Sequence, residues 1–91
     1  GEEGFGSVIV VVDSVSGKVA AGPEIHARGN VWDEGAFDGI TQPILDAVNA
    51  DLREGVTDTY QLQQRIRRVN GRWVSDTHRR RPMIIPVVIE A

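Results

Sequence analysis

The feature that most constrains this fold is a run of five consecutive β-branched residues, at positions 8–12. β-Branched side chains favour extended backbone. A strand with one face in water alternates apolar and polar residues, whereas this run shows no alternation. We therefore predict a strand over residues 7–13, at the centre of a sheet and covered on both faces.

Turn-forming residues follow this run and predict a hairpin. Residues 14–17 have turn chemistry, and Gly17 can adopt a positive φ. A second strand is expected over residues 18–21, resuming over residues 25–28, because the Gly22-Pro23 step interrupts it. The first two strands then pair antiparallel.

Apolar residues at spacings of three or four next predict an amphipathic helix that starts near Asp33 and Glu34 and ends at Gly55. The acids suit the positive end of the helix dipole, and glycine suits a left-handed cap. Pro43 makes the helix either kink or restart just before it; since the apolar stripe keeps its phase, we expect a kink. The stripe comprises Phe37, Ile40, Ile44, Val48 and Leu52.

A second helix is expected to begin at Asp58, which forms a capping-box pattern with Gln61. Gly71 would weaken its interior by about 1 kcal/mol relative to alanine, which suggests close packing or a bend there. The apolar stripe of this helix comprises Leu62, Ile66, Val69 and Trp73, and a different side carries Arg65, Arg68 and Arg72.

The chain closes on a second β-branched stretch, residues 83–89, which follows Pro82 and predicts a third strand. Pro86 is tolerated mainly on an edge strand, so the first strand should be central and parallel to the third. The order strand, strand, helix, helix, strand predicts an α+β fold, a small three-stranded sheet packed against two antiparallel helices. We expect residues 1–6 to be a linker from upstream domains and residues 7–91 to form one domain.

Composition argues against several kinds of site. The chain has no cysteine, which excludes disulfides and thiolate metal sites and suits a reducing cytosol. Its longest apolar run is too short to cross a bilayer. His26 and His78 lack ligand-like companions, and no Ser-His-acid arrangement or phosphate loop is readable. We therefore predict no catalytic residue and no metal ligand in this chain.

Charge is distributed unevenly along the chain. Residues 1–58 carry 11 acidic and three basic side chains, whereas residues 59–91 carry two acidic and seven basic ones. Such a split fits a basic surface that binds the phosphates of RNA. It fits equally well a fold in which residues 79–81 offset the negative helix end and arginines pair with Asp46, Asp51 and Glu54.

Two stretches carry a family resemblance. The segments GPEIHARG (residues 22–29) and THRRRPMIIPVVIEA (residues 77–91) resemble the C-terminal domain of bacterial ribonuclease J. The closing segment, with its threonine, arginines, methionine and two prolines, is the more specific of the two. The resemblance extends over residues 8–91.

This resemblance implies a metal-dependent parent enzyme with a metallo-β-lactamase domain and an inserted β-CASP domain, usually with zinc. Such enzymes cut RNA internally and degrade it from the 5′ end, maturing ribosomal RNA and turning over messenger RNA in the cytoplasm. Their His-x-His-x-Asp-His metal motif lies in upstream domains, and nothing in this chain matches it. The resemblance implies an accessory module, partnered by the upstream catalytic domains, that supports dimer or tetramer assembly and full activity.

Two hypotheses for the module itself follow. The first is subunit assembly through exposed apolar surface on the hairpin or an edge strand, with Val31 and Trp32 as contact residues. The second is an auxiliary RNA-binding module that uses an arginine-rich helix. Its proposed contacts are Arg65, Arg68, Arg72, Arg79 and Arg80.

Overall fold

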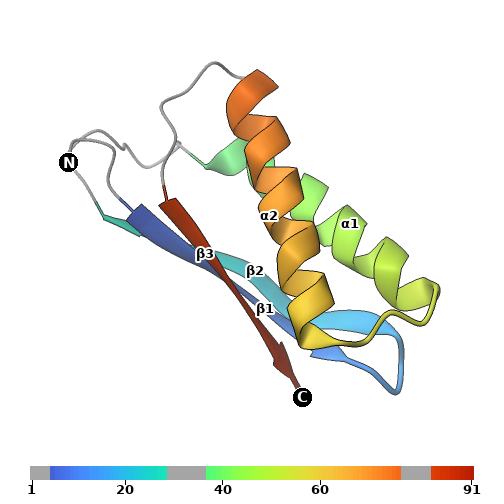
Figure 1. Cartoon of the computed structure of the whole chain (residues 1–91). Coiled ribbons are helices and arrows are strands. Elements are labelled where there is room, and N and C mark those ends of the chain that lie inside the picture. The colour runs from blue at the N-terminus through green and yellow to red at the C-terminus, as the bar shows by residue number, and fades with distance from the viewer. Residues whose placement is uncertain (1–4, 29–36, 77–82) are drawn as a thin grey trace.

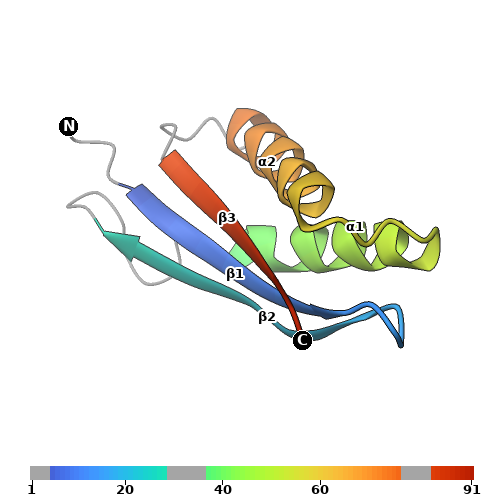
Figure 2. The same ribbon diagram turned by 60° about the horizontal axis from the view of Figure 1, so that its bottom comes forward.

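A computed structural model describes residues 5–28, 37–76 and 83–91 and shows a three-stranded sheet with two helices on one side of it (Figure 1, Figure 2). The element order confirms the predicted α+β class. The elements are β1 (Phe5–Asp13), β2 (Lys18–Arg28), the short 3-10 helix η1 (Asp38–Ile40), α1 (Thr41–Arg53), α2 (Thr59–Asp76) and β3 (Met83–Glu90).

The β-branched run forms the middle strand, as predicted. β1 pairs antiparallel with β2 and parallel with β3, in the order β2-β1-β3. The strand begins at Phe5, two residues earlier than the predicted segment, and Phe5 already pairs with Arg28 and Met83.

Only one face of β1 is covered by the described elements. Val8, Val10 and Val12 are at most 1% exposed and lie beneath the helices. Ile9 and Val11 point to the other face and are only half-buried. The prediction that both faces are covered is therefore wrong for the described part of the chain, because both helices pack on the same side of the sheet.

β2 is one continuous strand, so the predicted break at Gly22-Pro23 is wrong. Ile9 pairs with Glu24 and Val11 pairs with Ala21, so Gly22 and Pro23 together lie opposite a single residue of β1. Such a bulge lets a strand absorb extra residues without ending. Gly22 has φ +88°, and a Cβ there would lie 2.5 Å from the Ile9 carbonyl oxygen.

α1 begins at Thr41, so the predicted kink at Pro43 is also wrong: the helix starts just before the proline. Pro43 lies in the first turn, where its missing N–H would have no intrahelical partner. The 3-10 helix η1 precedes α1 and carries Ile40 into the core in phase with the α1 stripe. Asp33 and Glu34, the predicted helix start, lie outside the described residues.

Both expected helix caps next to the interhelical turn are confirmed. Gly55 has φ +87°, its N–H donates to the Leu52 carbonyl, and the Val56 N–H donates to the Asp51 carbonyl, each at 3.0 Å. These two bonds define a Schellman cap. At the start of α2, the Asp58 carboxylate accepts a 2.9 Å hydrogen bond from the Gln61 N–H.

The core joins the inner face of the sheet to the two apolar helix stripes. Both stripes behave as predicted: Ile44, Val48, Leu62 and Ile66 are fully or almost fully buried. Val69 and Trp73 are partly buried and pack against this core. Among the described residues, the buried cluster comprises Val8, Val10, Val12, Ile40, Ile44, Val48, Leu52, Leu62, Ile66, Ile84 and Val88.

Each helix also protects the outer edge of the sheet with a side-chain amide. The Asn49 Oδ1 atom of α1 accepts a 3.0 Å hydrogen bond from the Val19 N–H of β2. The Gln63 Oε1 atom of α2 accepts a 3.2 Å bond from the Val88 N–H of β3. Pro86 lies two residues before Val88, so its backbone nitrogen points to the same outer edge, away from β1. The missing N–H of proline therefore costs no hydrogen bond between β3 and β1. The predicted edge position of Pro86 is confirmed.

Gly71 is not a close-packing position: a Cβ added there would meet nothing within 4 Å. We predict that Gly71→Ala stabilises the fold by about 0.5–1 kcal/mol, because glycine in a helix interior costs conformational entropy without a packing benefit here. Chemical denaturation monitored by circular dichroism measures the change.

Gly22→Ala is the matched control, since the same methyl group would there meet the backbone of β1 at a positive φ. It should destabilise the chain by more than Gly71→Ala stabilises it. If Gly71→Ala destabilised the chain, the open surroundings of that position would be refuted.

Asp13 anchors the β1–β2 turn through its carboxylate. Its Oδ1 atom accepts hydrogen bonds from the N–H groups of Ser16 (3.2 Å) and Val15 (2.9 Å). These bonds, that from Ser16 foremost, lower the pKa of Asp13 below its ordinary value. Because the folded pKa is depressed, the contribution is fully present above about pH 3.9 and is lost as pH falls through the folded pKa.

The melting temperature of the wild-type chain should therefore exceed that of Asp13→Ala at neutral pH, and the difference should shrink as the solution is acidified below about pH 4. Thermal unfolding at a series of pH values tests this. A difference that stays constant or grows in acid would contradict the assigned role of the carboxylate.

Candidate functional site

A groove of about 340 Å³ opens between residues 65–73 of α2 and the first turn of α1. It brings together three of the five arginines that the sequence suggested for RNA binding. The residues that line it are Pro43, Arg65, Arg68, Val69, Arg72 and Trp73. We call this feature the arginine groove.

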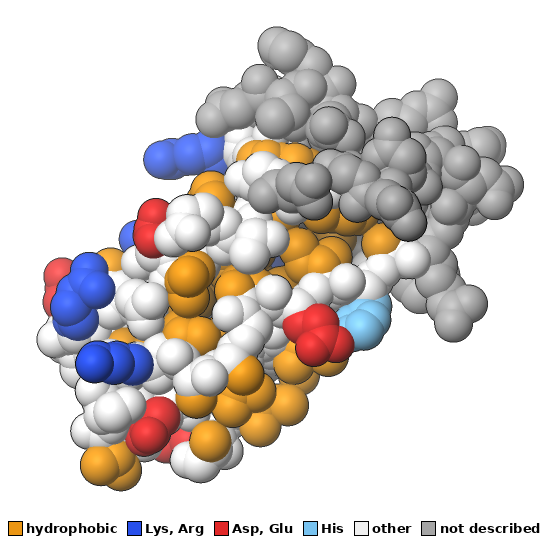
Figure 3. All heavy atoms as spheres, turned by 180° about the vertical axis from the view of Figure 1, so that it is seen from behind, with side chains coloured by type: hydrophobic (Ala, Val, Ile, Leu, Met, Phe, Trp, Pro, Cys, Tyr) orange, Lys and Arg blue, Asp and Glu red, His pale blue; other side chains and the backbone are white. Residues whose placement is uncertain are grey.

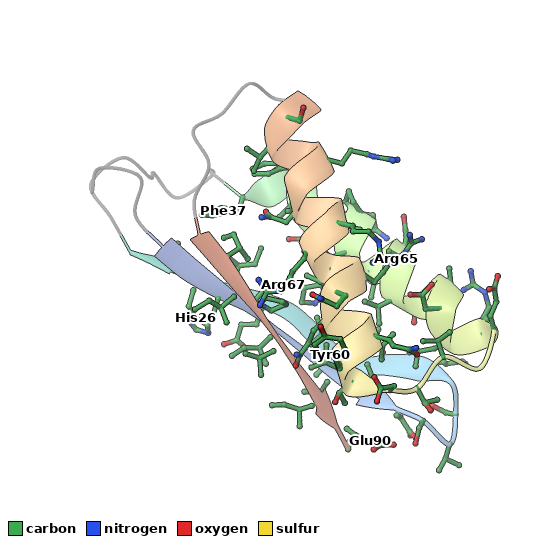
Figure 4. All side chains as sticks on the ribbon, in the orientation of Figure 1. His26, Phe37, Tyr60, Arg65, Arg67 and Glu90 are labelled. Atoms are coloured by element: carbon green, nitrogen blue, oxygen red, sulfur yellow. The ribbon has the colours of Figure 1, made fainter. Side chains whose placement is uncertain are left out.

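Helix periodicity explains why the arginines share this side of α2. Arg65, Arg68 and Arg72 are spaced by three and four residues, so they lie on one helical face. The rise of an α-helix separates the first from the last by about 10 Å. Arg65 leaves α2 toward α1, whereas Arg67 leaves it toward β3 (Figure 4).

The three arginines are not equivalent. Arg65 lies next to Asp51 of α1, with 3.7 Å between Nε and Oδ2, and its Nε is buried with no hydrogen-bond partner among the described residues. Its side chain is 38% exposed and that of Asp51 is 24% exposed. Arg68 and Arg72 are exposed and form no ion pair with any described residue. The competing interpretation of the charge pattern is that the arginines pair with acidic residues. Within this groove, and among the described residues, only Arg65 does so.

Trp73 forms an apolar wall of the groove. Its ring centroid lies 6.0 Å from that of Phe37, at an interplanar angle of 31°. Gly39 lies so close that a Cβ there would be 3.0 Å from the indole Nε1. Because Trp73 also packs against the core, its ring is held in place rather than free to rotate.

The electrostatic surroundings of the groove favour anions. None of the described residues that line it is acidic. α1 begins beside the groove and has no acidic residue in its first turn, so no carboxylate of that turn offsets the positive end of the helix dipole. Asp46, one helical turn along α1, accepts a 2.7 Å hydrogen bond from the Gln42 amide.

A second unusual surface lies on the side of the sheet away from the helices. Ile85 and Ile89 are 45% and 48% exposed there, next to half-buried residues of β1 and β3. Both described helices pack against the opposite face of the sheet (Figure 2). Hydrophobic side chains also gather on the side of the molecule seen in Figure 3. We call this surface the open face; it comprises Ile9, Val11, Ile85, Val87 and Ile89.

The sequence analysis allowed for exposed apolar surface on an edge strand, but it missed the β1 part of the open face, because five apolar residues in succession predict a strand covered on both sides. It also missed Pro43 and Val69 as groove residues, since only the pairing of α1 with α2 brings them together. Arg79 and Arg80, and the suggested contact residues Val31 and Trp32, lie outside the described residues.

The described residues contain no cluster of three or more His, Asp or Glu side chains suited to a metal ion. His26 is exposed and contacts Glu24 on the same strand. Among the described helices, none is long and apolar enough to span a bilayer.

We predict that the Arg65–Asp51 pair contributes little to stability, because both side chains are partly solvated. A double-mutant cycle with Arg65→Gln and Asp51→Asn should give a coupling free energy of at most about 1 kcal/mol that declines with added salt. A larger coupling, insensitive to salt, would show instead that the pair is desolvated in solution.

Comparison with known proteins identifies the family of this chain. A family model described as the ribonuclease J C-terminal domain matches residues 1–91. Ribonuclease J of Mycobacterium tuberculosis is 38% identical over 87 residues, which cover 96% of this chain. The Mycolicibacterium smegmatis ribonuclease J has the same identity and coverage. Ribonuclease J 2 of Staphylococcus aureus is 32% identical over 92 aligned residues, covering 98% of this chain. In each case the match spans 16% of the relative's own length.

Proposed function

This chain belongs to the ribonuclease J C-terminal domain family, and we propose that it is the assembly module of a ribonuclease J-like enzyme, joining subunits through the open face. Assembly and catalysis are then carried out by different parts of the parent enzyme. The module contributes no catalytic residue, and RNA hydrolysis belongs to upstream domains of the same chain.

The observation that carries the proposal is the mismatch between the sequence of β1 and its surroundings. The strand is apolar on both faces, yet the helices cover only the face of Val8, Val10 and Val12. Contiguous apolar surface left in water is unfavourable, and on a folded protein it marks an interaction site. Ile85 and Ile89 enlarge this surface from β3.

We assign the open face to a second copy of this chain. A symmetric dimer places the same patch on both partners, so the apolar surface of the open face is complementary to itself, with Glu24 of β2 at its border. The β-branched side chains of this patch are stiff and lose little rotamer freedom on burial. The upstream domains of the parent enzyme are the competing occupant of this face.

For the parent enzyme we propose the activities that the family resemblance implies. These are metal-dependent endonuclease and 5′-to-3′ exonuclease cleavage of RNA, with zinc held by the upstream domains, in the cytoplasm. The relatives' name, ribonuclease J, supports RNA as the substrate. The assembly role predicts that losing this module lowers the activity of the parent by dissociating its subunits.

Sedimentation velocity of the 91-residue chain over a range of concentrations tests the assembly role. The wild-type chain should form dimers or tetramers, and Ile85→Lys with Ile89→Lys should shift it to monomer, because two charges would be buried at the contact. Both positions are about half-exposed, so the monomer itself should stay folded.

Val15→Lys is the matched control, since Val15 is 96% exposed at the hairpin tip and is not part of the open face. It should leave assembly unchanged. A wild-type chain that remains monomeric at high concentration would overturn the assembly role and favour the upstream domains as the occupant of this face.

A further inference from the structure

We infer that the arginine groove binds the phosphate backbone of single-stranded RNA, with Arg68 and Arg72 as the phosphate contacts and Trp73 as a stacking wall. The choice of RNA rests on the proposed function, in which this chain is a module of a ribonuclease. The site itself is independent of the assembly role, because it lies in the helical layer and the open face lies on the other side of the sheet.

Unbalanced positive charge singles out this groove. The chain as a whole carries a net charge of −3. Yet Arg68 and Arg72 face the groove without an ion-pair partner among the described residues, and no described lining residue is acidic. Binding there would therefore be local and not a consequence of overall charge.

The spacing of the charges suits a polyanion better than a single small anion. Arg68 and Arg72 are one helical turn apart, and Arg65 extends the row by one more turn along the groove. A guanidinium group binds phosphate oxygens through two parallel N–H bonds. Asp51 lies next to Arg65 and partly offsets its charge, so Arg65 should attract phosphate less strongly than Arg68 and Arg72 do.

The uncharged part of the lining selects nucleic acid over other polyanions. Trp73 presents a ring held by Phe37 and the core, and a fixed aromatic side chain stacks on any unpaired base. Pro43 and Val69 complete an apolar wall. A groove of about 340 Å³ accommodates a short part of one strand, not a duplex. Apart from the arginines, no described lining side chain can hydrogen-bond base edges in pairs, so sequence preference should be weak.

Fluorescence anisotropy with a labelled oligouridylate, titrated with the 91-residue chain at several salt concentrations, tests the site. Wild-type binding should weaken steeply with salt. Arg68→Gln with Arg72→Gln should weaken it roughly tenfold at low salt and flatten the plot of log K against log salt by about 1.4, or about 0.7 for each lost phosphate contact.

Arg53→Gln with Arg67→Gln is the matched control. It removes the same charge from two exposed arginines that do not line the groove, and it should leave affinity and salt dependence nearly unchanged. An equal loss in this control would show that binding follows net charge alone and would overturn the assignment.

Trp73 provides a second measurement that needs no change in the groove. The chain has two tryptophans, so Trp32→Phe leaves Trp73 as the sole reporter. Oligouridylate should quench its fluorescence with the same affinity as the anisotropy titration. Binding without a change in Trp73 emission would place the RNA elsewhere.

Two further outcomes would reject the inference. One is the absence of oligouridylate binding at low salt. The other is polyglutamate binding as tightly as RNA, which would make the groove a site for acidic polypeptides. The assembly variants Ile85→Lys and Ile89→Lys should bind RNA through this groove like the wild type, so failure of one proposal is distinguishable from failure of the other.

Discussion

The structure depends on one burial event: the inner face of β1 must be removed from water. Val8, Val10 and Val12 lie at the middle of a narrow sheet, and two helices placed side by side are needed to cover them. α1 lies over β2 and α2 lies over β3. The antiparallel helix pair, its tight turn at Gly55 and the amide bonds to both sheet edges all serve this cover.

Covering one face so completely leaves the molecule with two chemically different sides. The helical layer faces water with charged residues, and its paired helices create the arginine groove. The opposite side of the sheet keeps apolar residues because the same strands supply both faces. A module of this kind can contact protein on one side and an anion on the other without conflict.

The arginines of α2 show how a charge pattern is divided by packing. Arg65 turns toward α1 and meets Asp51, whereas Arg67 turns toward β3. Arg68 and Arg72 remain exposed beside the groove. Both interpretations of the uneven charge therefore hold in part: Arg65 is paired with an acidic residue, whereas Arg68 and Arg72 form an unbalanced basic surface.

The sequence by itself determined the element types, their order, the central position of β1 and the helix ends at Gly55 and Asp58. These follow from periodicity and from bonds between residues close in the chain, which any folded context preserves. Tertiary structure alone decided the helix start ahead of Pro43 and the bulge that keeps β2 continuous at Gly22. It also decided the arginine groove and the open face. These last two features arise where segments distant in sequence meet. An apolar or charged pattern specifies the environment that a side chain prefers, but it does not specify which element will pack against it.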